Sequence, residues 1–235
     1  MNILCVAAHA DDTEILCAGT LALYVKQGHQ VTMAVFTDGK LGDAKVKPDE
    51  LGPIIEKEAR ASAAVIGAHV ILSEVLDEHV FPNEKQRRIM IDVLREADPD
   101  VIFTHSPNDY HPDHRYVSQL VFDSYFQKGL PFIPNQNREA CRFAKAQLYY
   151  MDNICGIGFT PTEYVDITDT FETKKKMLLC HQSQFVAMED LASTDMLELI
   201  EIQSRFRGLA AGCRYAEGFN RVDAYQRGLT RRVLP

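Results

Sequence analysis

The sequence predicts an α/β fold, a Rossmann-like, mostly parallel sheet with helices on both faces that forms a single domain over residues 1–235. Three observations predict it. Short apolar runs alternate with amphipathic segments through the first half of the chain. These runs are continuously apolar, as in strands that helices cover on both faces. No linker, repeat or low-complexity segment divides the 235 residues, of which 46% are hydrophobic, so one sizeable core is expected.

The predicted elements follow in order along the chain. Strands are expected at residues 3–8, 30–37, 69–75 and 100–105, separated by helices at 17–27, 53–67 and 84–97. Gly28 ends the first helix, and Pro53 and Gly67 suit the start and the end of the second, since proline favours a first helical turn and glycine a helix end. A loop at 129–137, strands at 144–151 and 163–168, and a mostly helical region from about 168 to 207 complete the expected fold.

Composition excludes several classes of function. The net charge is −8 and the sequence has no long basic block, which disfavours nucleic-acid and anionic-membrane surfaces. The six cysteines are scattered without a CxxC pair, so neither a disulfide framework nor a cysteine zinc site is expected. No apolar run approaches the ~20 residues of a membrane span, and no secretory signal pattern is present. We therefore expect a cytoplasmic protein that binds neither nucleic acid nor a membrane.

Two polar clusters follow predicted strands. His9, Asp11 and Asp12 end the first apolar run, and the segment THSPNDYHPDH, residues 104–114, follows the fourth. In open parallel sheets the carboxyl ends of the strands meet at one edge, where ligands bind. Adjacent carboxylates beside an imidazole at the end of a buried strand are unfavourable unless a cation lies among them. The two clusters therefore predict a shared cation site.

The residue types favour a divalent transition metal over a dinucleotide. The turn after the first strand lacks GxGxxG and carries two anions where a pyrophosphate would need backbone N–H groups. Imidazole nitrogen and carboxylate oxygen bind zinc at about 2.0–2.2 Å, and a catalytic zinc keeps three protein ligands and an open position for water. Iron, cobalt and nickel accept the same ligands.

With these motifs in view, the sequence resembles the PIG-L, or LmbE-like, family of metal-dependent N-deacetylases. The resemblance rests on the order and spacing of HADDTEILCAGTLA, TDG, KEARASAAVIGA, NDYHPDH, HQSQF and YAEGF. It implies a zinc-dependent hydrolase that removes acetyl from an N-acetylglucosamine-type conjugate, a small-molecule substrate, and is compatible with a homo-oligomer. HADD, HQSQF and YAEGF also resemble the branch that deacetylates glucosaminyl-malate.

The resemblance implies a role for each residue of the two clusters. It makes His9, Asp12 and His114 the metal ligands, Asp11 the general base and His111 the group that assists the oxyanion or the leaving amine. The chemistry agrees, because attack by a metal-activated water needs a neighbouring unligated carboxylate and a donor for the developing oxyanion.

Several residues keep two interpretations. Asp113 is expected either to orient an imidazole or to N-cap the helix that begins near His114. Tyr110 is expected to donate to the substrate or to pack on the surface, and Asp38 to contact the substrate or form a turn. His105 is expected to be a packed strand-end residue, and His181 to complement a helix dipole or to serve the reaction.

Two further points concern the substrate. The YAEGF segment at 215–219 is a candidate to close over the active site. Family members commonly carry an arginine where this sequence has Ile55, so a charged substrate group held at that position is not implied.

Three other functions are compatible with the sequence. An amidase acting on a non-sugar N-acyl small molecule would use the same metal chemistry. A non-catalytic metal-binding module would use the same ligands. A nucleotide-binding oxidoreductase would share the fold but needs the missing glycine fingerprint.

Overall fold

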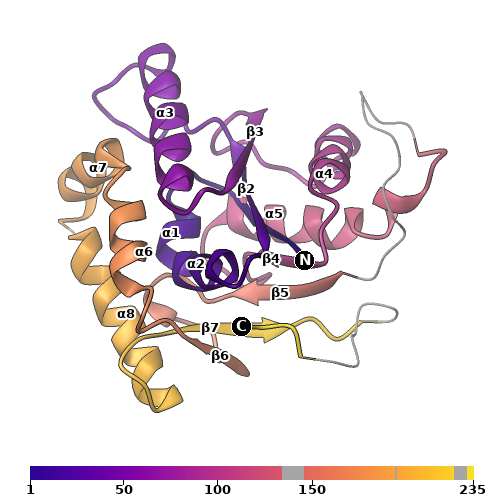
Figure 1. Ribbon diagram of the computed structural model, residues 1–235. Helices are drawn as coiled ribbons and strands as arrows, with labels where there is room; N and C mark the ends of the chain where they lie inside the picture. Colours follow the sequence, from indigo (N-terminus) through magenta and orange to yellow (C-terminus); the bar gives the residue numbers. More distant parts are fainter. Residues whose placement is uncertain (134–145, 194, 225–231) are drawn as a thin grey trace.

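The computed structural model describes residues 1–133, 146–193, 195–224 and 232–235. Within these residues the strands form one seven-stranded sheet in the order β3-β2-β1-β4-β5-β7-β6. The neighbours from β3 to β5 are parallel, whereas β7 runs antiparallel to β5 and β6. The predicted Rossmann-like, mostly parallel α/β fold is therefore confirmed (Figure 1). The strands are β1 (Asn2–Ala7), β2 (Gln30–Thr37), β3 (His69–Val75), β4 (Val101–Thr104), β5 (Gln147–Met151), β6 (Glu163–Asp166) and β7 (Ala216–Arg221).

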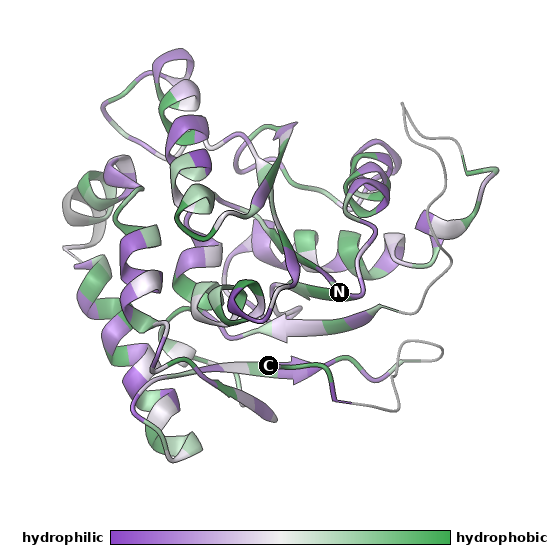
Figure 2. Cartoon of the chain, viewed as in Figure 1, coloured by the Kyte–Doolittle hydropathy of each residue, from purple (hydrophilic) through white to green (hydrophobic). Residues whose placement is uncertain are grey.

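Helices cover both faces of the sheet, and their hydrophobic and hydrophilic residues are mixed along each helix, as expected for elements that face a sheet on one side and solvent on the other (Figure 2). No described helix combines the length and apolarity that a bilayer-spanning segment requires. The helices are α1 (Asp12–Leu16), α2 (Ala18–Lys26), α3 (Pro48–Ile66), α4 (Glu84–Ala97), α5 (Pro112–Ser124), α6 (Phe171–Leu178), α7 (Gln182–Ala192) and α8 (Met196–Ala211), with 3₁₀ turns η1 (Gln127–Gly129) and η2 (Ile154–Gly156).

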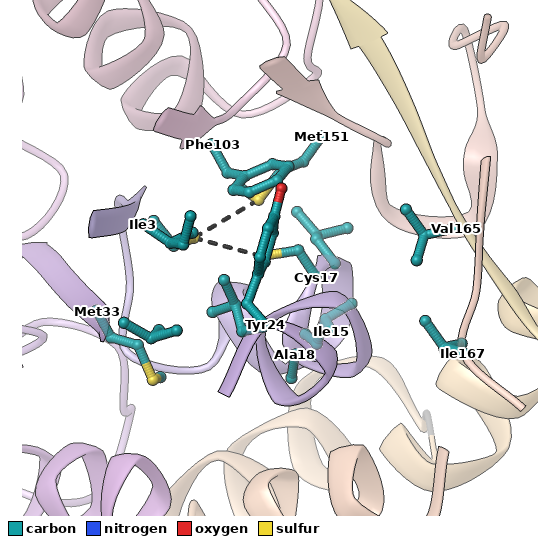
Figure 3. Packing of buried hydrophobic residues seen from close by; sticks show 14 of the residues in the cluster. Ile3, Ile15, Cys17, Ala18, Tyr24, Met33, Phe103, Met151, Val165 and Ile167 are labelled. Carbon is teal, nitrogen blue, oxygen red and sulfur yellow. Dashed lines mark hydrogen bonds between the residues drawn. The ribbon is translucent and has the colours of Figure 1, made fainter. Parts of the chain in front are cut away.

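The core is divided by the sheet into two main clusters. Successive side chains of β1 point to opposite faces, so Ile3 joins the cluster under α2 and α6, whereas Leu4 joins the cluster under α4 and α5. Figure 3 shows Tyr24 of α2 packed beside Phe103 of β4, with ring centroids 6.1 Å apart. Burial on both faces is why the inner strands are continuously apolar in sequence.

Several predicted boundaries differ from the structure. Helix α3 begins at Pro48, which occupies the first turn, and Pro53 lies inside the helix. Proline suits the first turn of a helix, so either Pro48 or Pro53 could have marked the start. The helix begins at the earlier of the two. The predicted strand at 144–151 is observed from Gln147, and residues 134–145, which include part of the predicted loop, lie outside the described residues.

The YAEGF segment does not close over the active site. It contributes to β7, where Phe219 is buried between the sheet and its covering helices. The Glu217 carboxylate accepts hydrogen bonds from the backbone N–H groups of Gly19 (3.0 Å) and Thr20 (2.8 Å) at the start of α2, and from Lys174 Nζ (2.7 Å). The sequence did not predict β7, because its apolar and polar residues do not alternate and one of its buried residues is the charged Glu217.

Candidate metal centre and active site

The carboxyl ends of β1 and β4 bring the two polar clusters together. His9 Nδ1 lies 3.2 Å from His114 Nε2, which lies 3.2 Å from Asp12 Oδ1. His9 Nδ1 also lies 3.3 Å from Asp12 Oδ2. Ligand atoms at about 2.1 Å from a tetrahedral zinc lie ~3.4 Å apart, and each of these three distances is close to that spacing, although the two Asp12 contacts are made by different oxygens. Ligand atoms within 4.8 Å of one another also group His9 and His114 with His111, and Asp12 and His114 with His105.

The electrostatics of the three side chains also favour a cation. Burial by itself would lower the pKa of His114, but Asp12 and Asp109 outweigh it and raise that pKa to about 9. The pKa of His9 is likewise well above its ordinary value, because Asp12, Asp113 and hydrogen bonding outweigh burial. The surrounding carboxylates therefore stabilise positive charge where the donor atoms converge.

A carboxylate lies behind each imidazole. Asp109 Oδ2 is 3.2 Å from His114 Nδ1, and Asp77 Oδ1 is 3.3 Å from His9 Nε2. Partners of this kind fix the tautomer and the orientation of histidine ligands. Sequence reasoning missed both residues, although Asp109 lies within the NDYHPDH motif and Asp77 follows β3. The rule that ligands gather at strand ends, applied to β3 as well, would have found Asp77.

Asp113 connects the site to the loop after β3. Its Oδ2 lies 3.5 Å from His9 Nε2 and accepts the N–H of Glu78 at 2.9 Å. The N-cap of α5 is His111, whose Nδ1 accepts the N–H of Asp113 at 3.2 Å. The N-capping alternative for Asp113 is therefore wrong, and its position matches the alternative of orienting an imidazole.

Asp11 occupies the N-cap position of α1 without a side-chain capping bond and faces the cavity beside Asp12. Burial and the neighbouring charge of Asp12 raise the pKa of Asp11 to about 6. His111 faces the same cavity, and burial together with His9 and His114 lowers its pKa. Because its Nδ1 accepts a backbone N–H, neutral His111 carries its proton on Nε2, 3.3 Å from Glu78 Oε1. The nitrogen of His111 that is left to donate toward the cavity is therefore Nε2.

These groups line one end of a cavity of about 220 Å³. Tyr110 lies at its rim with 66% of its surface exposed. Asp38 is not among the residues of the wall. Its carboxylate accepts the backbone N–H of Lys40 and of Asp77, each at 3.3 Å, and pairs with Lys40 Nζ at 3.0 Å. Asp38 therefore lies in position to hold the loop that carries Asp77. The apolar part of the wall consists of Ile15, Ile55, Ile154, Met188, Met196 and Leu199.

His105 is a packed strand-end residue, as expected. Its Nε2 accepts the N–H of Ala8 at 3.0 Å, and its ring stacks on His114 with centroids 3.9 Å apart. Burial lowers the pKa of His105 to about 4, which keeps the ring neutral against His114. His105 thereby supports the proposed ligand from the side of β4.

His181 differs from the expected helix-dipole partner. It is fully buried, and its Nε2 lies 3.3 Å from Oε1 of the equally buried Glu14, to which Ser62 donates a hydrogen bond. Glu58 accepts both the N–H (2.9 Å) and the hydroxyl (2.6 Å) of Ser183. The KEARAS and HQSQ motifs thus meet through two sets of polar contacts, one of which includes Glu14 of α1, the helix that carries Asp12.

Comparisons with known proteins show which proteins the chain resembles. The chain is 29% identical over 237 residues to diacetylchitobiose deacetylase from Thermococcus kodakarensis, covering 94% of this chain and 83% of the relative. The structure of N,N'-diacetylchitobiose deacetylase from Pyrococcus horikoshii superposes with a TM-score of 0.79 at 26% identity, over 94% and 83% of the two chains. The 4-carboxy-2-hydroxymuconate hydratase of Pseudomonas putida shares the fold, with a TM-score of 0.81 at 20% identity over 99% and 100% of the chains.

The family model for PIG-L, described as GlcNAc-PI de-N-acetylase, matches residues 4–125. That range contains both strand-end clusters and every proposed ligand. The chain belongs to the PIG-L family.

Proposed function

We propose that this protein is a zinc-dependent hydrolase that removes the N-acetyl group from an N-acetylglucosamine-type sugar conjugate. One observation carries the proposal: His9 Nδ1 and His114 Nε2 lie 3.2 Å apart and each lies 3.2–3.3 Å from one oxygen of Asp12, with the carboxylate of Asp11 beside them and a cavity in front. The deacetylases among the relatives support the same reaction class.

The side chains divide the work of amide hydrolysis. A divalent cation held by the three ligands would act as a Lewis acid and lower the pKa of water toward ~7. Asp11 accepts the proton of the attacking water and delivers it to the leaving nitrogen, so the amide C–N bond breaks as acetate and a free amine form. His111 donates its Nε2–H to the carbonyl oxygen as negative charge develops there, a contact of a kind worth about 10²–10³ in rate. Asp109 and Asp77 hold the two imidazoles in place meanwhile.

Two alternatives are weaker. A non-catalytic metal module would use a closed coordination shell, whereas these ligands open onto a cavity that also contains Asp11 and His111. An amidase for non-sugar N-acyl compounds would use the same chemistry and is separated by substrate alone. Location in the cytoplasm and assembly into a homo-oligomer stay predictions.

Acetate release from a panel of N-acetylglucosamine conjugates and N-acetyl amino acids tests the proposal. Metal-quantified protein is compared with a chelated sample, with Asp11→Asn, and with Asp123→Asn, a matched change at an exposed position of α5. We expect release from sugar conjugates that the chelator and Asp11→Asn abolish and that Asp123→Asn preserves. Release from the amino acids alone would favour the amidase, and no release at full metal occupancy would refute hydrolysis.

A further inference from the structure

The wall of the cavity carries a strong imbalance of charge. Four carboxylates line it, from Asp11, Asp12, Asp77 and Glu78, and a divalent cation at the proposed ligands would offset two of these charges. The described residues of this wall include no lysine and no arginine. A substrate carboxylate or phosphate would therefore meet carboxylates, with no lysine or arginine of the described wall to pair with.

Two cationic side chains, one in the loop after β2 and one on α5, are held by other groups. Lys40 Nζ pairs with Asp38 at 3.0 Å. Arg115 Nη1 donates to the carbonyl oxygens of Asp109 (2.8 Å) and Tyr110 (2.7 Å), so its guanidinium is used in shaping the segment that precedes α5. Neither Lys40 nor Arg115 belongs to the wall.

Ile55 of α3 gives part of the wall an apolar surface. It is 5% exposed, and a Cβ added to Gly39 would lie only 2.7 Å from its Cδ1, so the side chain is packed tightly against the loop after β2. Ile154, Met196 and Leu199 extend the apolar wall from η2 and α8. A charged substrate group placed against this surface would lose its hydration without gaining a partner.

Glu78 is the carboxylate most available to a substrate. Its side chain is 53% exposed, and its Oε1 lies 3.3 Å from His111 Nε2 at the cavity. The backbone has a φ of 58°, and its N–H is held by Asp113 at 2.9 Å, which fixes the direction of the residue. An ionised carboxylate only accepts hydrogen bonds, so Glu78 suits hydroxyl or amide N–H donors and opposes anions.

We propose that the cavity selects an uncharged amino-sugar conjugate, with Glu78 as the specificity-determining residue that accepts a substrate hydroxyl and rejects carboxylate- or phosphate-bearing conjugates. The amino-sugar part of this inference rests on the proposed function. The selection against anions rests on the four carboxylates, the apolar wall around Ile55 and the absence of lysine and arginine from the described wall.

The test uses two probes that share one skeleton and differ in charge: N-acetylglucosaminyl-malate and its dimethyl ester. Acetate release by the metal-loaded enzyme gives kcat/KM for each, and titration calorimetry with metal-loaded Asp11→Asn gives their affinities without turnover. We expect the diester to be preferred by about 10-fold or more, because facing like charges disfavour the diacid. We expect Glu78→Gln to reduce the preference to within about 3-fold, and the exposed change Glu74→Gln on β3 to leave it intact.

The outcomes separate the two proposals. Equal or tighter binding of the diacid, or a preference unchanged in Glu78→Gln, would overturn the selection inferred here even if both probes are hydrolysed. Failure of Asp11→Asn to bind the diester would overturn it as well. Selective binding of the diester without acetate release from any amide would uphold the selection and refute the deacetylase.

Discussion

Replacing Asp109 by asparagine tests whether the buried carboxylates tune the metal site. Asp109 is 3% exposed, and its Oδ2 lies 3.2 Å from His114 Nδ1. Its charge favours a proton on Nδ1 and so leaves Nε2 free for a metal. Asparagine has nearly the same shape, keeps a carbonyl oxygen and removes the charge, so the backbone N–H of His111, 2.9 Å from Oδ1, keeps an acceptor.

The expected loss follows from this single contact. Changes to such outer carboxylates weaken metal binding by roughly 10–100-fold, which corresponds to ~1.4–2.7 kcal/mol at 25 °C. Zinc affinity is measured by competition with a chromogenic chelator at fixed pH, with metal content checked on the same samples. Thermal unfolding of the metal-free variant shows whether the fold itself has changed.

Asp123→Asn is the matched control, because Asp123 is exposed on α5, the helix that carries His114. If Asp109→Asn binds zinc within about 2-fold of the wild-type affinity, the reasoning is refuted. Asp109 would then not orient His114 so that its Nε2 faces the ion.

Three further predictions concern stability. Lys174→Met should destabilise the fold by about 3–5 kcal/mol in denaturant titrations, because it leaves the buried Glu217 carboxylate without its cation, whereas the exposed Lys176→Met on the same helix should change stability by less than about 0.5 kcal/mol. A loss equal to that of Lys176→Met would contradict the buried pair. Gly19→Val should lower stability by at least ~1–3 kcal/mol, since even a Cβ at this position would lie 2.8 Å from Ile167, and an unchanged melting temperature would show that α2 can shift. Removing the metal with a chelator should lower the melting temperature by roughly 5–11 °C relative to protein with free zinc at about 100 times Kd, and no shift would argue against metal binding by the folded state.

The strands and helices of the first half of the chain were predictable because their apolar residues follow regular periods. Residues 30–37 and 69–75 were predicted as strands and are observed over the same positions as β2 and β3. The helix at 84–97 was also predicted with its observed bounds. Local patterns predict these bounds because each element buries one surface in the core, and the buried residues recur with a regular period.

The sequence failed where a residue's environment is made by distant segments. In β7 the buried Glu217 belongs to no strand pattern, and its partners Gly19 and Lys174 come from α2 and α6. For His181 the sequence predicts a helix-dipole partner or a residue that serves the reaction, since nothing near it in the sequence shows that Glu14 lies beside its ring. Such contacts arise only when remote elements pack together.

The sequence by itself determined the family resemblance, the sheet and the meeting of HADD with HPDH at one edge, because strand ends follow from local periodicity and parallel topology. Only the tertiary structure decided which nitrogen of each histidine faces the shared position. It also placed Asp77 and Asp109 behind the rings and set Ile55 in the cavity wall. Side-chain orientation depends on packing against segments far apart in the chain, and no local pattern records it.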